Sequence, residues 1–252
     1  MEASERRVAV VGNDERASEL RDAVRDAGGR LAAAASAEAT LLVAVGDEAI
    51  RDAVVAAPGG TVVPVADRRL AFDRDGAVDA LSGLLGESET GAPVGRVTHP
   101  VLGVEGAGVA SGRAAFDVAL VTDEPARISE FAVAFSRGRD ESVRADGVVV
   151  ATPLGSDGYA NAVGAPLVEP GGGLSVAPIA PFSTRTDAWV AGDRVQITVE
   201  RESEPIGLVV DGERCGTVEP HRPIAIEAVD RVAFAVPRGR RERDDRKHSN
   251  KS

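Results

Sequence analysis

The pattern of apolar segments changes partway along this chain of 252 residues. Up to about residue 85, β-branched runs alternate with segments whose apolar residues recur at helical spacing. The predicted strands cover 6–12, 40–45 and 61–66, and the predicted helices follow Asp14, follow Gly46 and cover 78–85. This alternation predicts a parallel sheet with helices on both faces.

The second part of the chain has strand patterns without helical ones. Its β-branched runs are separated by turn residues and lie at 116–122, 127–135, 147–152, 194–200, 205–213 and 231–236. The sequence therefore predicts a Rossmann-like α/β domain over residues 1–93 and a β-sandwich-like domain over 94–236. Residues 237–252 have no apolar side chain to anchor them, and we expect a disordered charged tail.

The charge balance is acidic, with 40 Asp and Glu residues against 29 Lys and Arg and a net charge of −11. We expect no nucleic-acid partner, because proteins that bind nucleic acids present basic surfaces. Lysine occurs only at Lys247 and Lys251. Such a surface resembles that of halophilic archaeal proteins, whose carboxylate repulsion is screened by salt. An ordinary acidic bacterial protein from a GC-rich genome is the alternative.

Metal and membrane sites are not expected from the sequence. Cys215 is the single cysteine and the three histidines lie far apart, which argues against a disulfide or a zinc site. No run reaches the roughly 18 to 20 apolar residues of a membrane span. The first residues lack the pattern of a signal peptide, so we expect a cytoplasmic protein.

Residues 146–170, DGVVVATPLGSDGYANAVGAPLVEP, are the most distinctive stretch. A predicted buried strand runs into a loop of glycine, hydroxylated and small residues that carries the only tyrosine, Tyr159. Small residues let a ligand approach the main chain closely, which predicts a binding loop. The alternative is a tight turn into a helix, with Tyr159 packed inside.

This stretch resembles the signature of the NAD kinase family, DGxxxxTPTGSTAYxxSAGGP. The matching residues are Asp146, Gly147, Thr152, Pro153, Gly155, Ser156, Tyr159, Gly164 and Pro166. The segment 174–190 is similar to the family's LxxTPIxPHSLxxRPxV, and VVDGE at 209–213 is similar to its DGQ turn. The resemblance covers roughly residues 6–236 and is weaker in the first half.

The resemblance implies a phosphotransferase of two domains. Members of the family move the γ-phosphoryl group of ATP, or of polyphosphate in some, to the 2′-hydroxyl of the adenosine ribose of NAD, which gives NADP. They use a divalent cation, usually Mg²⁺. The resemblance also implies a homodimer or a homotetramer.

Residues 45–49, VGDEA, stand where the family has GGDGT. The resemblance makes Asp47 the general base for the ribose hydroxyl, a role that suits a carboxylate hydrogen-bonded to the attacking oxygen. The alternative is that Asp47 is only the N-cap of the following helix. Glu48 replaces a glycine and adds negative charge where phosphates are expected to lie against the main chain.

Further binding residues are implied by alignment with the family's motifs. Asp117 takes the place of the acid in the family's Asn-Glu pair, while Phe116 replaces the amide. In the segment that the family writes GVNxGxLGFL, Val65, Leu70 and Phe72 match, but the asparagine and both glycines do not. The full set of candidate binding residues is Gly46, Glu48, Asp117, Arg127, Arg144, Asp146, Asp157, Gly158, Tyr159, Ala160, Asn161, Ala162 and Glu213.

Two other functions remain open from the sequence. The replacements at Glu48 and Phe116 also suit a paralogue that binds NAD or another adenine nucleotide as a sensor or regulator without catalysis. A protein that retains only the scaffold, as an interaction module, is the third possibility.

Overall fold

The computed structural model describes the greater part of the chain. Its described residues are 7–12, 15–33, 39–57, 59–85, 94–106, 108–109, 111–138, 140–183 and 187–238. The predicted helix cap at Asp14, the polar stretch 86–93 and residues 239–252 of the predicted tail lie outside them. Among the described residues, no helix is both long enough and apolar enough to span a bilayer.

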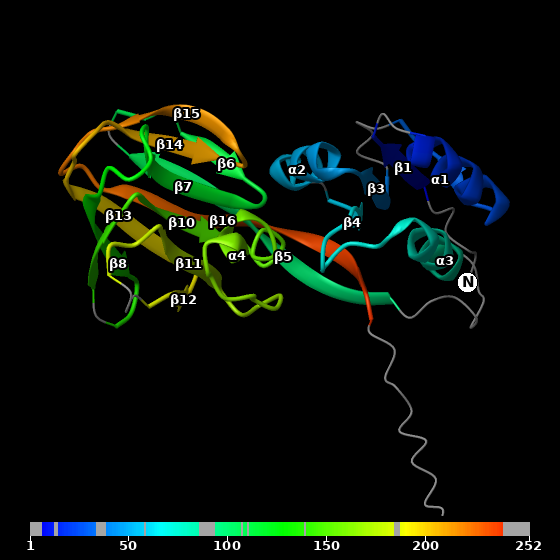
Figure 1. The fold of residues 1–252 in the computed structure, drawn as a ribbon. Coiled ribbons are helices and arrows are strands. Elements are labelled where there is room, and N and C mark those ends of the chain that lie inside the picture. The colour runs from blue at the N-terminus through cyan, green and yellow to red at the C-terminus, as the bar shows by residue number, and fades with distance from the viewer. Residues whose placement is uncertain are drawn as a thin grey trace, which may run out of the picture.

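The N-terminal half is a parallel sheet covered by helices. Its elements are β1 (Arg7–Val11), α1 (Glu15–Asp26), β2 (Arg30–Leu31), β3 (Leu41–Val45), α2 (Asp47–Ala56), β4 (Thr61–Val65) and α3 (Arg74–Leu85). The strands β2, β1, β3 and β4 pair in parallel in that order. Helices α1 and α3 share a core with one face of the sheet, and α2 packs on the other (Figure 1). The predicted architecture is confirmed, although α3 begins at Arg74 rather than at residue 78.

The C-terminal half is built mainly from strands. Its elements are β5 (Val94–Gly106), β6 (Gly112–Ala114), β7 (Asp117–Thr122), β8 (Ser129–Phe135), β9 (Glu141–Ala145), β10 (Gly147–Ala151), α4 (Tyr159–Ala162), β11 (Leu174–Ile179), β12 (Trp189–Ala191), β13 (Arg194–Arg201), β14 (Ile206–Val210), β15 (Glu213–Val218) and β16 (Ile224–Pro237). An antiparallel sheet, ordered β12-β11-β10-β7-β14-β15, faces the strands β5, β8, β9, β13 and β16 across one apolar core. This arrangement confirms the predicted β-sandwich-like half.

A ribbon of two long strands joins the halves. β16 pairs with β5 along its length, and its first residues also pair with β13. Near its end, Ala233 and Phe234 pair in parallel with β4. Figure 1 shows both long strands running from one half into the other. The sheet of the N-terminal half is therefore completed by a strand from the far end of the described chain.

The junction between the halves is buried and apolar. Leu154, which follows β10, packs in one cluster with Ile50 of α2 and Phe234 of β16. The ring of His99 in β5 lies 5.0 Å from the ring of Phe234, and burial lowers the pKa of His99 to about 3. Its Nε2 accepts a hydrogen bond of 3.4 Å from the main chain of Leu154. This packing fixes the loop after β10 against the N-terminal half.

Candidate functional site

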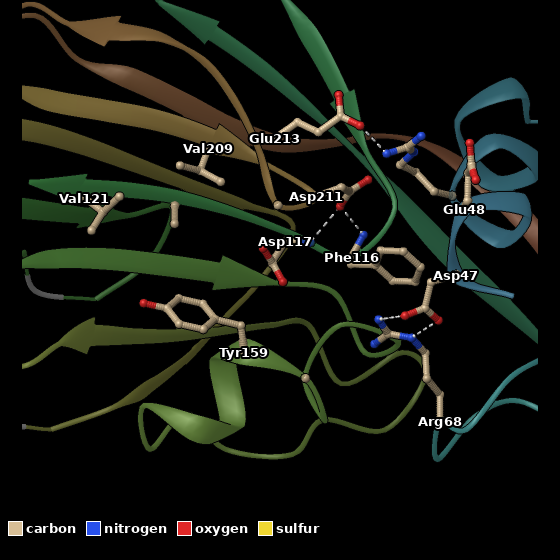
Figure 2. Close-up of a pocket in the computed structure, with 14 residues that line it drawn as sticks. Asp47, Glu48, Arg68, Phe116, Asp117, Val121, Tyr159, Val209, Asp211 and Glu213 are labelled. Atoms are coloured by element: carbon tan, nitrogen blue, oxygen red, sulfur yellow. Dashed lines mark hydrogen bonds and ion pairs between the residues drawn. The ribbon is translucent and has the colours of Figure 1, made fainter. Parts of the chain in front are cut away.

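A cavity of about 690 Å³ lies where the two halves meet. Ala119, Val121 and Val209 form an apolar surface on the face of the antiparallel sheet that is turned away from the sandwich core. The start of α2 and the loop after β4 contribute from the N-terminal half (Figure 2). The full lining is Asp47, Glu48, Arg51, Arg68, Phe116, Asp117, Ala119, Val121, Gly158, Tyr159, Val209, Asp211, Gly212 and Glu213.

Asp47 is the first residue of α2 and points into this cavity. The N-cap is Gly46, with φ of 87°, and no side chain caps the helix, so the N-cap interpretation of Asp47 is wrong. Glycine suits this position because side chains disfavour positive φ. The carboxylate of Asp47 is 57% exposed and accepts two hydrogen bonds of 2.8 Å from Nε and Nη2 of Arg68. This two-pronged geometry is the strong form of an arginine–carboxylate pair.

Arg68 lies in the loop between β4 and α3, and its side chain is only 16% exposed. Its guanidinium lies over the ring of Phe116, 4.1 Å from the centroid. Nη1 donates to the carbonyl oxygen of Leu154 at 3.4 Å and to Oδ1 of Asp157 at 3.5 Å. Burial opposes its charge, but the hydrogen bonds and attraction of Asp47 outweigh burial and raise the pKa of Arg68. Arg68 is thus a fixed cation.

Asp211 sets the position of Asp117. In the turn between β14 and β15, Asp211 accepts hydrogen bonds of 2.8, 2.7 and 3.0 Å from the main-chain N–H groups of Ala115, Phe116 and Asp117. Burial, and then the charge of Asp211, raise the pKa of Asp117 to about 6. Burial also raises the pKa of Asp211, against the effect of its three hydrogen bonds. The pair is therefore two carboxyl groups with limited access to water.

An ion pair crosses from α2 to the β14–β15 turn. Nη1 of Arg51 lies 2.6 Å from Oε1 of Glu213, whose side chain is 71% exposed. Glu48 also lines the cavity and forms no ion pair with any described residue. The lining holds five carboxyl groups, on Asp47, Glu48, Asp117, Asp211 and Glu213, and two guanidinium groups, on Arg51 and Arg68. A polyphosphate therefore needs added positive charge to bind here.

Comparisons with known proteins give the same assignment as the signature residues. Residues 117–237 match the ATP-NAD kinase C-terminal domain. An NAD kinase from Methanoculleus marisnigri is 35% identical over 136 residues, which is 53% of this chain and 50% of that protein. The C-terminal half of the chain is thus similar to NAD kinases in sequence.

Further NAD kinases are similar to this chain in sequence or in fold. A bifunctional NADP phosphatase/NAD kinase from Methanocaldococcus jannaschii is 34% identical over 123 residues, which is 48% of this chain and 21% of that protein. The chain thus spans half or less of these relatives' lengths. Solved structures share the fold at lower identity. An NAD kinase from Archaeoglobus fulgidus in complex with ATP has a TM-score of 0.62 and 21% identity, covering 91% of this chain and 92% of that one.

A second solved structure supports the same fold over both halves. Yeast NADH kinase complexed with NADH has a TM-score of 0.69 and 14% identity, covering 93% of this chain and 84% of that one. The N-terminal half, which resembles the family only weakly in its motifs, therefore keeps the architecture of an NAD kinase.

The structure brings part of the predicted NAD kinase site together at the cavity. The candidates that line it are Asp47, Glu48, Asp117, Gly158, Tyr159 and Glu213. Asp157 lies just behind the lining, where its Oδ2 accepts a 2.6 Å hydrogen bond from the main chain of Arg69. Gly46 shapes the turn before α2 rather than lining the cavity.

Other candidates do not line the cavity: Arg127, Arg144, Asp146, Ala160, Asn161 and Ala162. Arg127 forms ion pairs with Glu124 and Glu204.

The guanidinium of Arg144 lies 5.2 Å from the ring of Phe182. Asp146 accepts a hydrogen bond from the main chain of Ala126 at 2.9 Å. Ala160 is buried against the antiparallel sheet. The parts that these residues play in ligand binding remain predictions.

The sequence predicted that a ligand comes close to the main chain of the signature loop, residues 146–170. In the structure, the main chain before β7 makes that close approach instead. Residues 152–156 are buried, and a β-carbon on Gly155 would lie 2.2 Å from the carbonyl oxygen of Phe116. The small residues thus let this loop pack against Phe116, the residue just before β7. Of residues 152–162, Gly158 and Tyr159 line the cavity. The loop is a turn that leads into α4, as the alternative interpretation expected, but Tyr159 is 48% exposed rather than packed inside.

Sequence reasoning missed four lining residues that carry charge or aromatic contact: Arg51, Arg68, Phe116 and Asp211. Arg68 had a local signal, because the pair Arg68-Arg69 comes soon after the carboxyl end of β4, and ligand sites of parallel sheets form at that edge. Asp211 also had a signal, because it is the aspartate of the segment VVDGE, which resembles the family's DGQ turn. Phe116 was noted only as the loss of an amide, whereas its ring supports Arg68.

Proposed function

We propose that this protein transfers the γ-phosphoryl group of ATP to the 2′-hydroxyl of the adenosine ribose of NAD, giving NADP. The observation that carries the proposal is the position of Asp47. Its exposed carboxylate lines a cavity to which both halves of an NAD kinase fold contribute. Solved relatives with this fold hold ATP in one case and NADH in the other. The volume of about 690 Å³ is within the usual range for nucleotide-sized ligands.

The proposed role of Asp47 is that of a general base. Its carboxylate would accept a hydrogen bond from the 2′-hydroxyl and take its proton as that oxygen bonds to the γ-phosphorus. The bond from the γ-phosphorus to the bridging oxygen breaks, and ADP leaves. Phosphoryl transfer depends mainly on positioning and on charge neutralisation, so the cavity must hold the reacting groups in line.

The apolar part of the lining suits the aromatic parts of the ligands. Val121 and Val209 lie on the sheet, and Tyr159 lines the same cavity (Figure 2). Exposed aromatic and aliphatic surfaces of this kind bind flat rings by stacking and by burial of apolar area. We propose that a base or the nicotinamide ring lies here.

The carboxylates of the cavity fit a magnesium ion that arrives with the nucleotide. Among the described residues, no group of three or more His, Cys, Asp or Glu side chains is arranged to hold a metal. Mg²⁺ commonly binds through one or two carboxylates together with substrate phosphates, and Glu48 and Asp117 are carboxylates without an ion pair to a described residue. Bound there, the ion would neutralise charge on the transferred phosphoryl group.

NADP formation tests the proposal. Purified protein is incubated with NAD, ATP and MgCl₂ in concentrated KCl, and NADP is measured by an NADP-specific enzymatic cycling assay. We expect turnover, with a loss of roughly 100-fold or more in Asp47→Asn, as for removal of a general base. Asp22→Asn, on the exposed surface of α1, is the charge-matched control. Absence of NADP above the Asp47→Asn level would reject the proposal.

A nucleotide-binding regulator is the second candidate. Both carboxylate oxygens of Asp47 are engaged by Arg68, and carboxyl groups outnumber guanidinium groups in the lining. Calorimetric titration distinguishes the two functions. NAD binding without ATP binding or turnover favours the regulator, and binding of neither ligand removes both candidates.

A further inference from the structure

Arg68 is the least exposed cation of the cavity lining. Its side chain is 16% exposed, against 28% for Arg51, the other arginine of the lining. Arg51 is already paired with Glu213 at 2.6 Å and with Asp52 at 3.4 Å. Arg68 instead faces the carboxylate of Asp47 inside the cavity (Figure 2). Of the two arginines in the lining, Arg68 is therefore the one whose partner, Asp47, also faces the expected ligand.

We propose that Arg68 binds a phosphate group of the ligand by exchanging partners, so that a phosphate oxyanion replaces the carboxylate of Asp47 on its guanidinium. This inference rests on the proposed function and adds the residue that binds a phosphate group in the same site. Nε and Nη2 of Arg68 each donate at 2.8 Å to a different oxygen of Asp47. The same two N–H groups can donate to two oxygens of a phosphate, because a guanidinium group forms two parallel hydrogen bonds to a phosphate as it does to a carboxylate.

The surroundings fix Arg68 and leave Asp47 free to move. The guanidinium is held from one side by the ring of Phe116 at 4.1 Å and at Nη1 by Leu154 and Asp157. Asp47 is 57% exposed, and its side chain has no other hydrogen-bond partner among the described residues. The carboxylate can therefore return to water while the guanidinium stays in place.

The exchange has a consequence for Asp47. While both of its oxygens accept hydrogen bonds from Arg68, the carboxylate is held toward the guanidinium and competes poorly for a ribose hydroxyl. Once a phosphate occupies Arg68, the carboxylate is released to accept the hydroxyl proton. Phosphate binding would then prepare the base, and Arg68 acts as a binding residue that also positions Asp47.

Two ligands could supply the phosphate: the triphosphate of ATP and the pyrophosphate of NAD. Calorimetry with Mg²⁺ in concentrated KCl uses four probes: inorganic tripolyphosphate, ATP, NAD and uncharged adenosine. For Arg68→Gln we expect tripolyphosphate to bind about tenfold more weakly or worse, with adenosine unchanged. A weaker affinity for ATP alone identifies the donor as the source, and a weaker affinity for NAD alone identifies the acceptor.

Variants of Asp47 separate partner exchange from general electrostatics. Asp47→Ala removes the competing carboxylate, and we expect tripolyphosphate to bind more tightly to this variant. In the double variant with Arg68→Gln, most of that gain should disappear, because the gain depends on the freed guanidinium. A gain of equal size in both backgrounds would show only the removal of a negative charge and would overturn the inference.

Matched variants control for folding. Arg68→Lys keeps the charge but cannot bridge two oxygens, and we expect an intermediate loss of tripolyphosphate affinity. Arg69→Gln removes the adjacent arginine, which pairs with Glu169 outside the cavity, and should leave tripolyphosphate affinity unchanged. Thermal melts confirm that each variant is folded.

Two results would contradict the partner exchange. Equal tripolyphosphate binding by wild type and Arg68→Gln would remove Arg68 as the anion site. An equal loss of adenosine and tripolyphosphate binding would show that Arg68 only maintains the shape of the cavity. Failure to form NADP while tripolyphosphate still binds through Arg68 would reject the proposed function and leave the anion site standing.

Discussion

Replacing Asp117 by asparagine should stabilise the folded protein in a manner that depends on pH. Asparagine keeps the shape of the side chain and removes its titratable group. Burial, and then Asp211, raise the pKa of Asp117 from 3.8 to about 6. Between these values the folded protein binds the proton more tightly than the unfolded chain does. The stability that depends on Asp117 is therefore fully present at low pH and is lost as the pH rises through about 6.

The size of the effect follows from the shift. A pKa shift of about two units corresponds to roughly 3 kcal/mol of destabilisation once both states are ionised. At about pH 4.5 only about 1 kcal/mol of that cost is present, and at about pH 7.5 nearly all of it is. The stability of Asp117→Asn relative to wild type should thus increase by about 2 kcal/mol between these two pH values.

Urea denaturation followed by circular dichroism, in concentrated KCl at both pH values, measures this difference. Comparing the variant with wild type at each pH cancels the titration of groups that both proteins share. Asp22→Asn, which also removes one negative charge, controls for the change in net charge. The reasoning is refuted if the stability difference is the same at both pH values, or if it favours the variant more at the lower one.

Four further substitutions test the packing and the ion pair around the cavity, each by urea denaturation. Gly155→Ala should cost about 2 kcal/mol or more, because its β-carbon would lie 2.2 Å from a main-chain oxygen. Gly158→Ala, whose nearest neighbours lie at 3.4 Å, should change the unfolding free energy by less than about 1 kcal/mol. Leu154→Ala, at a fully buried site, should cost about 2–5 kcal/mol. Arg51→Gln, which breaks the exposed pair with Glu213, should cost under about 1 kcal/mol, and less as KCl increases.

The local patterns of the sequence predicted three of the strands of the N-terminal half but not β2 (Arg30–Leu31). β1, β3 and β4 are short buried runs between helical segments, and the structure confirms them. β5 was not predicted, because glycines and Pro100 interrupt its apolar residues. One of these glycines, Gly103, packs so closely on Val229 that a β-carbon would lie 2.5 Å from it. The pairing of β16 with β4 joins residues far apart in sequence, which no local pattern encodes.

The candidate site was predictable where single motifs supply a residue and not where distant segments meet. Asp47, Asp117 and Tyr159 come from three separate motifs, and all three line one cavity. Arg68 acts through contacts with Phe116 and with Leu154, which is 86 residues away in sequence. Such contacts follow from packing between the halves. The catalytic and binding roles of all these residues remain predictions until variants are assayed.

The strand that completes the N-terminal sheet is translated late. β4 ends at Val65, whereas its partners Ala233 and Phe234 in β16 are synthesised more than 160 residues later. Until then, the edge of β4 has no strand to pair with on that side and its apolar residues lack part of their cover. Nascent chains stalled before β16 should consequently be cut by protease near β4, and full-length chains should resist.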